Sequence, residues 1–204
     1  MNNRAYFGGG LPQAVKNILI INVLLFAATY FLKNINWDFL GMYYWQTSEF
    51  KLYQVITYMF MHANLAHIFF NMFAVFMFGA VLEHFWGAKK FLFYYFFTGI
   101  GAALAQQVVW YLSGNYGGIT IGASGAVFGL LLAYGWMFPN EKIYVYFALP
   151  VKAKYFVIIY GLMELSLGVA NFSGDNVAHF AHLGGMLFGL ILMFYWRKKG
   201  RLYS

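Results

Sequence analysis

Ser124 lies in a run of small residues whose spacing is typical of closely packed helices. Gly122, Gly125 and Gly129 stand at i, i+3 and i+7, so a helix places them on one face. Small residues on such a face let another helix approach closely. A serine hydroxyl at this contact can act as a nucleophile if a base lies within hydrogen-bond reach. The alternative is a packing helix in which the serine is incidental.

His182 stands in a matching pattern near the end of the chain. His182, Gly185 and Gly189 are again at i, i+3 and i+7. If the two glycine faces meet, the helix axes come closer than the usual separation of about 8–10 Å, and the imidazole reaches the hydroxyl of Ser124. A histidine inside a membrane is costly and indicates function by default. The alternative is a structural histidine whose hydrogen bond holds the bundle together.

A third polar pair supplies hydrogen-bond donors. His67 and Asn71 are at i and i+4 and therefore project from one helical face. Both side chains can donate while neutral, which suits a pocket for the charge that develops on a carbonyl oxygen during acyl transfer. His62 lies five residues earlier, about 140° further round the helix. We expect His62 to serve solvent access or structure.

A zinc site is the main alternative use of these histidines. His62, His67, His179 and His182 are expected at one level, but no two of them have the i, i+4 spacing that is common among zinc ligands. Glu164 is expected near the middle of its helix, where a hydrogen bond to another helix is favoured over a catalytic role. The sequence does not identify its partner. We predict neither a metal nor a cofactor.

The composition excludes an ordinary soluble domain. The chain is 62% hydrophobic, 23% aromatic and 9% charged, and it contains no cysteine. A spanning helix needs about 20 mostly apolar residues. We predict an all-α membrane protein with six such helices and an aromatic loop, 33–61, in the headgroup region. The expected helices are 15–32, 62–82, 91–112, 121–138, 154–172 and 177–196.

The charges predict how these helices are oriented. With six spans both termini share one side, and all 13 basic residues except Lys33 and Lys51 fall on it. This is the positive-inside pattern, so the termini are expected in the cytoplasm. It also accounts for the net charge of +7 without nucleic acid. The polar groups on helices two, four and six then lie about 4–14 Å below the outer helix ends, so the site opens outward.

Three motifs in this order resemble the rhomboid intramembrane serine proteases. Nearly the whole chain fits, and the motifs are Gly122–Gly125, Ala181–Gly185 and His67–Asn71, with further likeness in Tyr58–His62 and Gly79–Glu83. The resemblance implies one domain, 1–204, in the cell membrane, which cuts transmembrane protein substrates with Ser124 as nucleophile and His182 as general base. His67, Asn71 and the backbone N–H of Ser124 would hold the oxyanion, with the glycines at 122, 125 and 185 in support.

The family works as a dyad, and this chain is expected to do the same. Asp175 is the only carboxylate close in sequence to the base and is assigned to a loop, so packing against Phe128 is expected to orient the histidine. Two positions depart from the family: Tyr53-Gln54 replaces a frequent Trp-Arg pair, and Phe128 stands where some members have tyrosine. The competing interpretations are a catalytically inactive relative that binds membrane proteins, and a transporter or channel. Substrate identity, oligomeric state and lipid dependence do not follow from the sequence.

Overall fold

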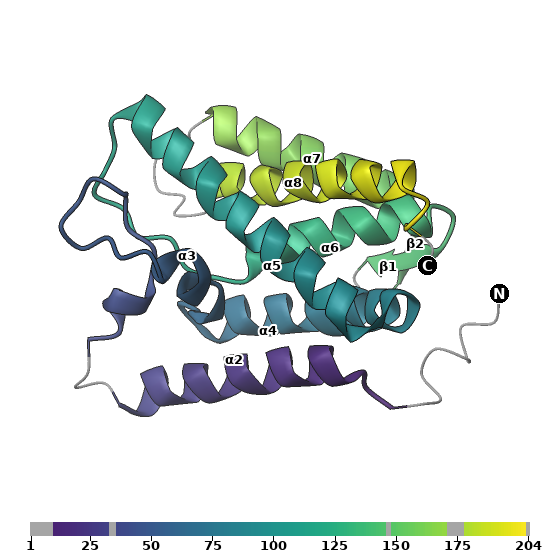
Figure 1. Cartoon of the computed structure of the whole chain (residues 1–204), viewed down its shortest axis with the longest axis horizontal. Coiled ribbons are helices and arrows are strands. Elements are labelled where there is room, and N and C mark those ends of the chain that lie inside the picture. Colours follow the sequence, from purple (N-terminus) through teal and green to yellow (C-terminus); the bar gives the residue numbers. More distant parts are fainter. Residues whose placement is uncertain (1–9, 33–35, 146–147, 171–177, 203–204) are drawn as a thin grey trace.

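The computed structural model describes residues 10–32, 36–145, 148–170 and 178–202, and it is mostly helical. Arg4, Lys33 and Asp175 lie outside the described residues. Helices α2, α4, α6 and α8 lie roughly along one direction, and the long helix α5 crosses them obliquely (Figure 1). Their bounds are α2 Gln13–Phe31, α4 Leu65–Ala74, the π-helical η3 Val75–Gly79, α5 Ala80–Ser113, α6 Ser124–Met137, α7 Ala153–Ala170 and α8 His179–Lys198.

Three helices begin at the same end of the molecule. In Figure 1, α4, α6 and α8 start at the left and run to the right, whereas α2 and α7 run the other way. The first turns of α4, α6 and α8 carry His67, Ser124 and His182 respectively. The shared level that the sequence predicted for these polar groups therefore agrees with the helix directions.

Four stretches are long and apolar enough to cross a membrane. They are Gln13–Phe31, Leu65–Ser113, Ala153–Ala170 and His179–Lys198, while Ser124–Met137 is a shorter apolar helix. The second stretch covers α4, η3 and α5, which follow one another directly in the chain. Gly87 interrupts its helical backbone with φ 74° and ψ 161°, a conformation that glycine adopts without a Cβ penalty. The chain turns at this residue. Residues 83–90, which lie between two of the predicted helices, are therefore helical on both sides of a kink.

Helix α6 begins later than the sequence predicted. The expected start was residue 121, but Gly122 has φ +119° and the helix starts at Ser124. Gly122 therefore does not share a helical face with Gly125 and Gly129, and that part of the predicted stripe is wrong. Its backbone N–H instead donates to the carbonyl oxygen of Tyr58 at 2.8 Å. This turn sets where the first residue of α6 lies.

A buried carboxylate fixes the start of α2 against the rest of the bundle. Glu83 accepts hydrogen bonds from the backbone N–H groups of Ala14 at 2.9 Å and Val15 at 2.7 Å. The first N–H groups of a helix lack partners within the helix, and their partial positive charge favours an anion. Glu83 is only 5% exposed, so its charge is stabilised by these donors rather than by water.

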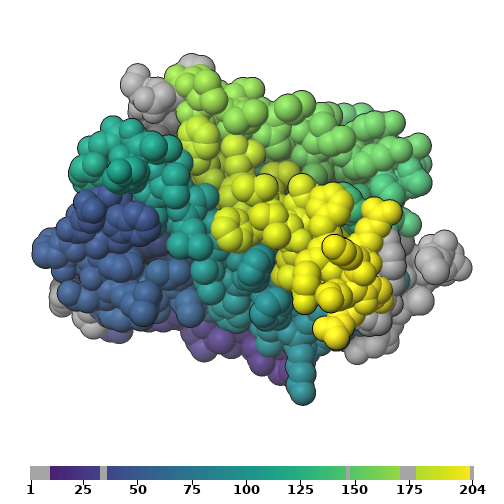
Figure 2. All heavy atoms as spheres, turned by 45° about the horizontal axis from the view of Figure 1, so that its top comes forward, coloured from purple at the N-terminus to yellow at the C-terminus, as the bar shows by residue number. Residues whose placement is uncertain are grey.

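The segment from Asn36 to Phe60 is folded around Gln54. This segment contains η1 Asp38–Leu40, α3 Gln54–Thr57 and η2 Tyr58–Phe60. The fully buried Gln54 amide donates to the carbonyl oxygens of Phe39 and Glu49 and accepts from the backbone N–H of Lys51. Figure 2 shows the segment (blue) beside the end of α5 (teal) and away from the C-terminal end of α8 (yellow). The Tyr53-Gln54 pair that departs from the family pattern thus supplies the anchor of this segment.

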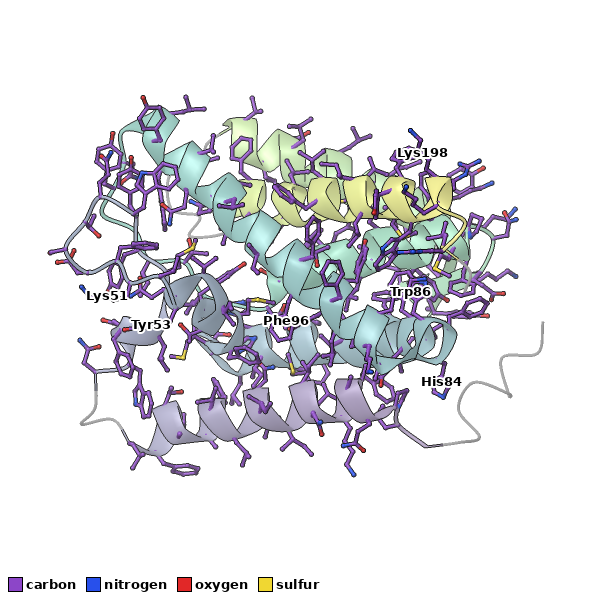
Figure 3. All side chains as sticks on the ribbon, viewed as in Figure 1. Lys51, Tyr53, His84, Trp86, Phe96 and Lys198 are labelled. Carbon is purple, nitrogen blue, oxygen red and sulfur yellow. The ribbon has the colours of Figure 1, made fainter. Side chains whose placement is uncertain are left out.

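A short hairpin adds strands to the expected all-helical fold. Strands β1 Lys142–Val145 and β2 Leu149–Lys152 pair antiparallel, with Lys142 opposite Lys152. The hairpin joins α6 to α7 at the end opposite the start of α4 (Figure 1). Figure 3 labels residues of both ends: Lys51 and Tyr53 at one, and His84, Trp86 and Lys198 at the other.

Helices α6 and α8 approach each other closely at Gly125 and Gly185. A Cβ placed on Gly185 would overlap the carbonyl oxygen of Gly125, which is backbone and cannot move aside. The other glycines of the two stripes face α5 instead, since Gly129 lies against Thr98 and Gly189 against Tyr94. Gly185 meets the backbone of Gly125, whereas a Cβ on Gly125 would overlap Ala102 of α5. The glycine face of α6 therefore packs on α5, and the prediction that the two glycine faces meet each other is wrong.

We expect Gly185→Ala to lower the free energy of unfolding by about 1–3 kcal/mol or more, because the added methyl group forces two backbones apart. Gly161→Ala in α7 is the matched control. Its Cβ would meet only the flexible end of Met186, 3.3 Å away, and alanine favours a helix over glycine by about 0.5–1 kcal/mol. Unfolding of the purified protein in mixed micelles measures both. Equal stability of the two variants would contradict the close contact.

Candidate active site

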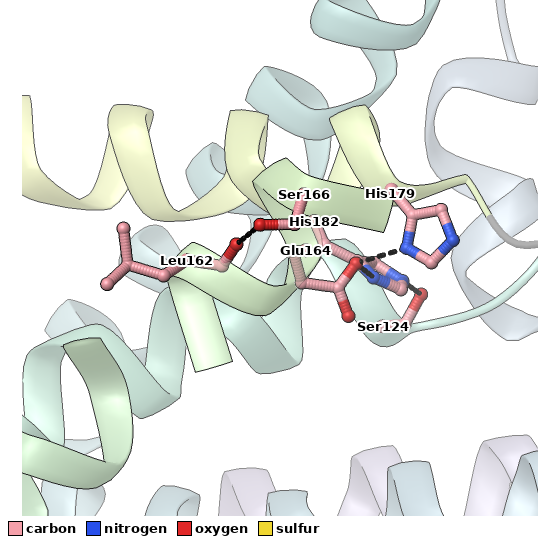
Figure 4. A network of polar contacts seen from close by, with 6 residues as sticks. All are labelled: Ser124, Leu162, Glu164, Ser166, His179 and His182. Atoms are coloured by element: carbon pink, nitrogen blue, oxygen red, sulfur yellow. Dashed lines mark hydrogen bonds and ion pairs between the residues drawn. The ribbon is translucent and has the colours of Figure 1, made fainter. Parts of the chain in front are cut away.

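The hydroxyl of Ser124 and the imidazole of His182 form a hydrogen bond. Ser124 Oγ lies 2.8 Å from His182 Nε2 (Figure 4). Ser124 is half-buried as the first residue of α6, and His182 is 8% exposed in the first turn of α8. A donor–acceptor distance in this range is what proton transfer to a general base requires. The contact between Gly125 and Gly185 brings the two helices close enough for it.

Phe128 holds the plane of the imidazole. Its ring is stacked on that of His182 with 4.3 Å between centroids and 9° between planes. Phe128 lies one turn after Ser124 on α6, so one helix supplies both the hydroxyl and the surface on which the imidazole rests. The packing that the sequence predicted for Phe128 is present in the structure.

His67 lies beside the serine, against Gly122. A Cβ on Gly122 would be 2.6 Å from His67 Nε2 and 3.7 Å from Ser124 Oγ, so only glycine leaves room for this ring. His67 Nδ1 accepts a hydrogen bond from the backbone N–H of Ala63 at 3.3 Å. In the neutral ring the proton then sits on Nε2. His67 can therefore donate from the nitrogen that is nearest to the serine.

Asn71 is one turn further along α4 and is buried at 5% exposure. Its amide nitrogen donates to the carbonyl oxygen of His67 at 3.0 Å. This bond uses one of the two amide hydrogens and leaves the other for a ligand. Asn64 begins the same helix by accepting from the backbone N–H of His67 at 2.8 Å, which fixes the first turn that carries the imidazole.

His62 precedes the spanning helix and packs against His67. Their rings meet edge to face, 5.0 Å apart. His62 is 6% exposed, and neither of its ring nitrogens has a hydrogen-bond partner among the described residues. Burial, with a further contribution from the neighbouring His67, lowers the pKa of His62 to about 4. The side chain is neutral at pH 7 and is part of the site's wall.

Glu164 is the residue that the sequence analysis did not assign to the site. Its Oε2 lies 2.9 Å from His182 Nδ1 and 2.7 Å from His179 Nδ1 (Figure 4). The expectation that packing alone orients the base, without a carboxylate partner, is therefore wrong. The expected hydrogen bond between helices is present, and its partners are two histidines of α8.

The direction of α7 explains where Glu164 lies. It stands six residues before the last described residue of α7, Ala170, at the end of the bundle where α8 starts. His182 lies three residues after the start of α8. An acidic residue in a spanning helix is expected to have a polar partner. The next helix of the antiparallel pair, α8, supplies it.

Three groups at this point have the chemistry of metal ligands. One ligand atom each of Glu164, His179 and His182 lies within 4.8 Å of the others. A carboxylate with two imidazoles is a donor set found in catalytic zinc sites. The prediction against zinc assumed that Glu164 lies away from the histidines. That assumption is therefore wrong. In this geometry the same atoms already satisfy one another as hydrogen-bond partners.

Comparison with known proteins identifies the family. Residues 49–199 match the family described as rhomboid domain. The chain belongs to the rhomboid family. It is 33% identical over 190 residues to rhomboid-like protein 11, chloroplastic, of Arabidopsis thaliana, a match that covers 86% of this chain and 62% of that protein.

Two bacterial rhomboids are also similar to this chain. The putative rhomboid protease YdcA of Bacillus subtilis (strain 168) is 30% identical over 154 residues, which covers 74% of this chain and 71% of that protein. The rhomboid protease GlpG of Salmonella newport (strain SL254) is 30% identical over 150 residues, with 72% and 49% covered. The chain thus spans between about half and 71% of the length of these three rhomboids.

We expect His62→Leu to make the fold less sensitive to acid. The pKa of His62 falls from 6.5 to about 4 on folding, so between these values the unfolded chain binds the extra proton. The stability that the neutral ring contributes is complete above pH 6.5 and is lost as the pH falls toward 4. Between pH 7 and pH 5 the variant should lose about 1–2 kcal/mol less than the wild type, measured by unfolding in micelles. An equal loss in both proteins would contradict the low pKa.

Proposed function

We propose that this rhomboid is an intramembrane serine endopeptidase that hydrolyses peptide bonds in or near the transmembrane segments of other proteins. The observation that carries the proposal is the 2.8 Å hydrogen bond between Ser124 Oγ and His182 Nε2. The printed names of the relatives YdcA and GlpG, which include the word protease, support the same activity. Activity, substrates and lipid partners of the whole protein are part of this proposal.

In the first half of the reaction, Ser124 attacks the carbonyl carbon of an unwound substrate segment. His182 Nε2 accepts the hydroxyl proton as the bond forms, and then gives it to the leaving amine. In the second half, water attacks the acyl carbon while His182 accepts a proton from it. The bond from this carbon to Ser124 Oγ then breaks, and His182 returns the proton to Oγ. Hydrocarbon supplies no water, so this water molecule must enter from the aqueous end near the start of α6.

Donors for the oxyanion lie on two sides of Ser124. His67 carries its proton on Nε2, next to Gly122 and the serine. The backbone N–H of Ser124 belongs to the first turn of α6, where no earlier helical carbonyl accepts it. With the free amide hydrogen of Asn71, these groups could stabilise the tetrahedral intermediate. Removing one donor of an oxyanion pocket costs about 10²–10³ in kcat in other serine proteases.

The proposed topology has six membrane crossings by one domain, 1–204. The 49 residues of Leu65–Ser113 would extend about 74 Å as a straight helix, whereas the hydrocarbon core is about 30 Å thick. The turn at Gly87 divides this stretch into two crossings. The 14 residues of α6 extend only about 21 Å, so this crossing would be completed by the non-helical residues before Ser124.

The proposed orientation puts the start of α6 toward the outer side. The hairpin strands with Lys142 and Lys152, and Lys198 at the end of α8, lie at the opposite end of the molecule (Figures 1 and 3). Basic residues favour the cytoplasmic face, so we place this end in the cytoplasm and the protein in the cell membrane. The first loop, 33–61, would lie in the outer headgroup region.

We expect Ser124→Ala to reduce cleavage of a transmembrane substrate in liposomes by at least about 10⁴-fold, since the nucleophile is gone. Ser166→Ala is the matched control. That hydroxyl is exposed on α7 and donates a hydrogen bond to the carbonyl oxygen of Leu162. A fluorophosphonate probe should label the wild type and the control at Ser124, and labelling should be lost in His182→Ala. Full cleavage by Ser124→Ala would refute the assignment.

A further inference from the structure

We propose that Glu164 is a positioning residue that holds His182 in the tautomer and orientation needed to act on Ser124. This inference rests on the proposed protease activity and extends it, because it gives the base a carboxylate partner on a third helix. Ser124 of α6, His182 of α8 and Glu164 of α7 then act as one unit. The dyad predicted from the sequence becomes a triad in this chain.

The contacts form a continuous chain of hydrogen bonds. Ser124 Oγ lies 2.8 Å from His182 Nε2, and His182 Nδ1 lies 2.9 Å from Glu164 Oε2 (Figure 4). Glu164 is 5% exposed and His182 is 8% exposed. The carboxylate thus meets the imidazole on the nitrogen that the serine does not use. A carboxylate in this place is the arrangement of a general base with an orienting group.

The carboxylate decides which nitrogen of His182 carries the proton. An ionised carboxylate only accepts hydrogen bonds, so His182 Nδ1 must donate to it. In the neutral ring Nε2 is then unprotonated and can accept the proton of the serine hydroxyl. In the opposite tautomer Nε2 would donate to the serine hydroxyl instead of accepting from it, and Glu164 would face the lone pair of Nδ1.

His179 supports this charge state. Its Nδ1 lies 2.7 Å from the same oxygen of Glu164, so two imidazole N–H groups can donate to one carboxylate oxygen. Hydrogen bonds to an ionised acceptor are among the stronger ones in proteins. Two such donors offset part of the cost of burying the charge. His179 therefore serves the carboxylate.

A second restraint on the imidazole is needed during the reaction. The stack on Phe128 fixes the plane of the ring, but it leaves rotation within that plane free. The bond to Ser124 limits this rotation only until Nε2 takes the proton. The bond from Nδ1 to Glu164 persists through that change, and the negative carboxylate stabilises the imidazolium that forms.

We expect Glu164→Gln to lower kcat by about 10²–10⁴ and to leave KM within about twofold. Removing the carboxylate from other serine protease triads has effects of about this size. The glutamine has nearly the same shape, but its amide can donate to His182 Nδ1 and so favour the wrong tautomer. The rate of fluorophosphonate labelling at Ser124 should fall with kcat. Both are measured in liposomes per folded molecule.

Ser166→Ala on the same helix is the control and should keep wild-type kcat and KM. A carboxylate that only joins α7 to α8 would give a different result in Glu164→Gln: a lower unfolding midpoint with an unchanged kcat per folded molecule. That result overturns the proposal. A raised KM with unchanged kcat overturns it as well, because it would assign Glu164 to substrate binding.

A measurement on the unaltered protein tests the same point if Glu164→Gln does not fold. Nitrogen NMR of the wild type with ¹⁵N-histidine, in liposomes, reports which nitrogen of each ring is protonated. The signal that disappears in His182→Ala identifies the ring. We expect protonated Nδ1 and unprotonated Nε2 for His182 near pH 7. A proton on Nε2 instead of Nδ1 overturns the proposal.

The outcomes separate this inference from the protease activity and from a metal site. Cleavage by the wild type that Ser124→Ala abolishes but Glu164→Gln leaves intact overturns the inference alone. An inactive wild type refutes the activity, while the tautomer of His182 can still be read. Treatment with a chelator should leave cleavage within about twofold. A loss that added Zn²⁺ restores would overturn the positioning role in favour of a metal bound by Glu164, His179 and His182.

Discussion

The close approach of α6 and α8 is the constraint on which the site depends. Gly125 and Gly185 let two helix backbones touch, and a single methyl group at Gly185 would overlap a carbonyl oxygen that has no room to move. Only at this separation can the hydroxyl of Ser124 lie 2.8 Å from the imidazole of His182. Helix packing in a membrane lacks a hydrophobic driving force, so small residues and polar contacts have to hold the helices together. The proposed catalytic groups are therefore also part of what joins the helices.

The same need for polar contacts inside the bundle explains how the buried carboxylates are held. Where water is scarce, a carboxylate needs donors from the protein itself. Glu83 obtains them from the first backbone N–H groups of α2, and Glu164 obtains them from His179 and His182. The first contact orders a helix end and has no link to the serine. The second contact lies next to Ser124 and His182. Glu164 can therefore have a different role from Glu83, although both are equally buried.

Much of the site could be predicted because helical periodicity is a local property. The spacing of glycines around Ser124 and after His182 indicated two packing faces, and the order of the motifs indicated the family, which the comparison confirms. The stack of Phe128 on the imidazole was predicted from the resemblance to the family, and the structure shows it. The backbone turn at Gly122 could not be predicted. A glycine three residues before Gly125 fits a helical stripe and a turn that starts a helix equally well. The anchoring role of Gln54 was hidden for a similar reason, since its partners are backbone groups of an irregular segment.

The sequence by itself determined that the protein is a membrane rhomboid, which side chains could carry its chemistry, and that three of its helices bring polar groups to one level. The tertiary structure decided where α6 starts and what Glu164 contacts. The physical reason is that a repeat along one helix specifies a face, whereas a contact between helices depends on their relative shift and rotation. A relative shift of one residue moves a side chain by about 1.5 Å, which is enough to take a donor out of hydrogen-bond reach of its acceptor.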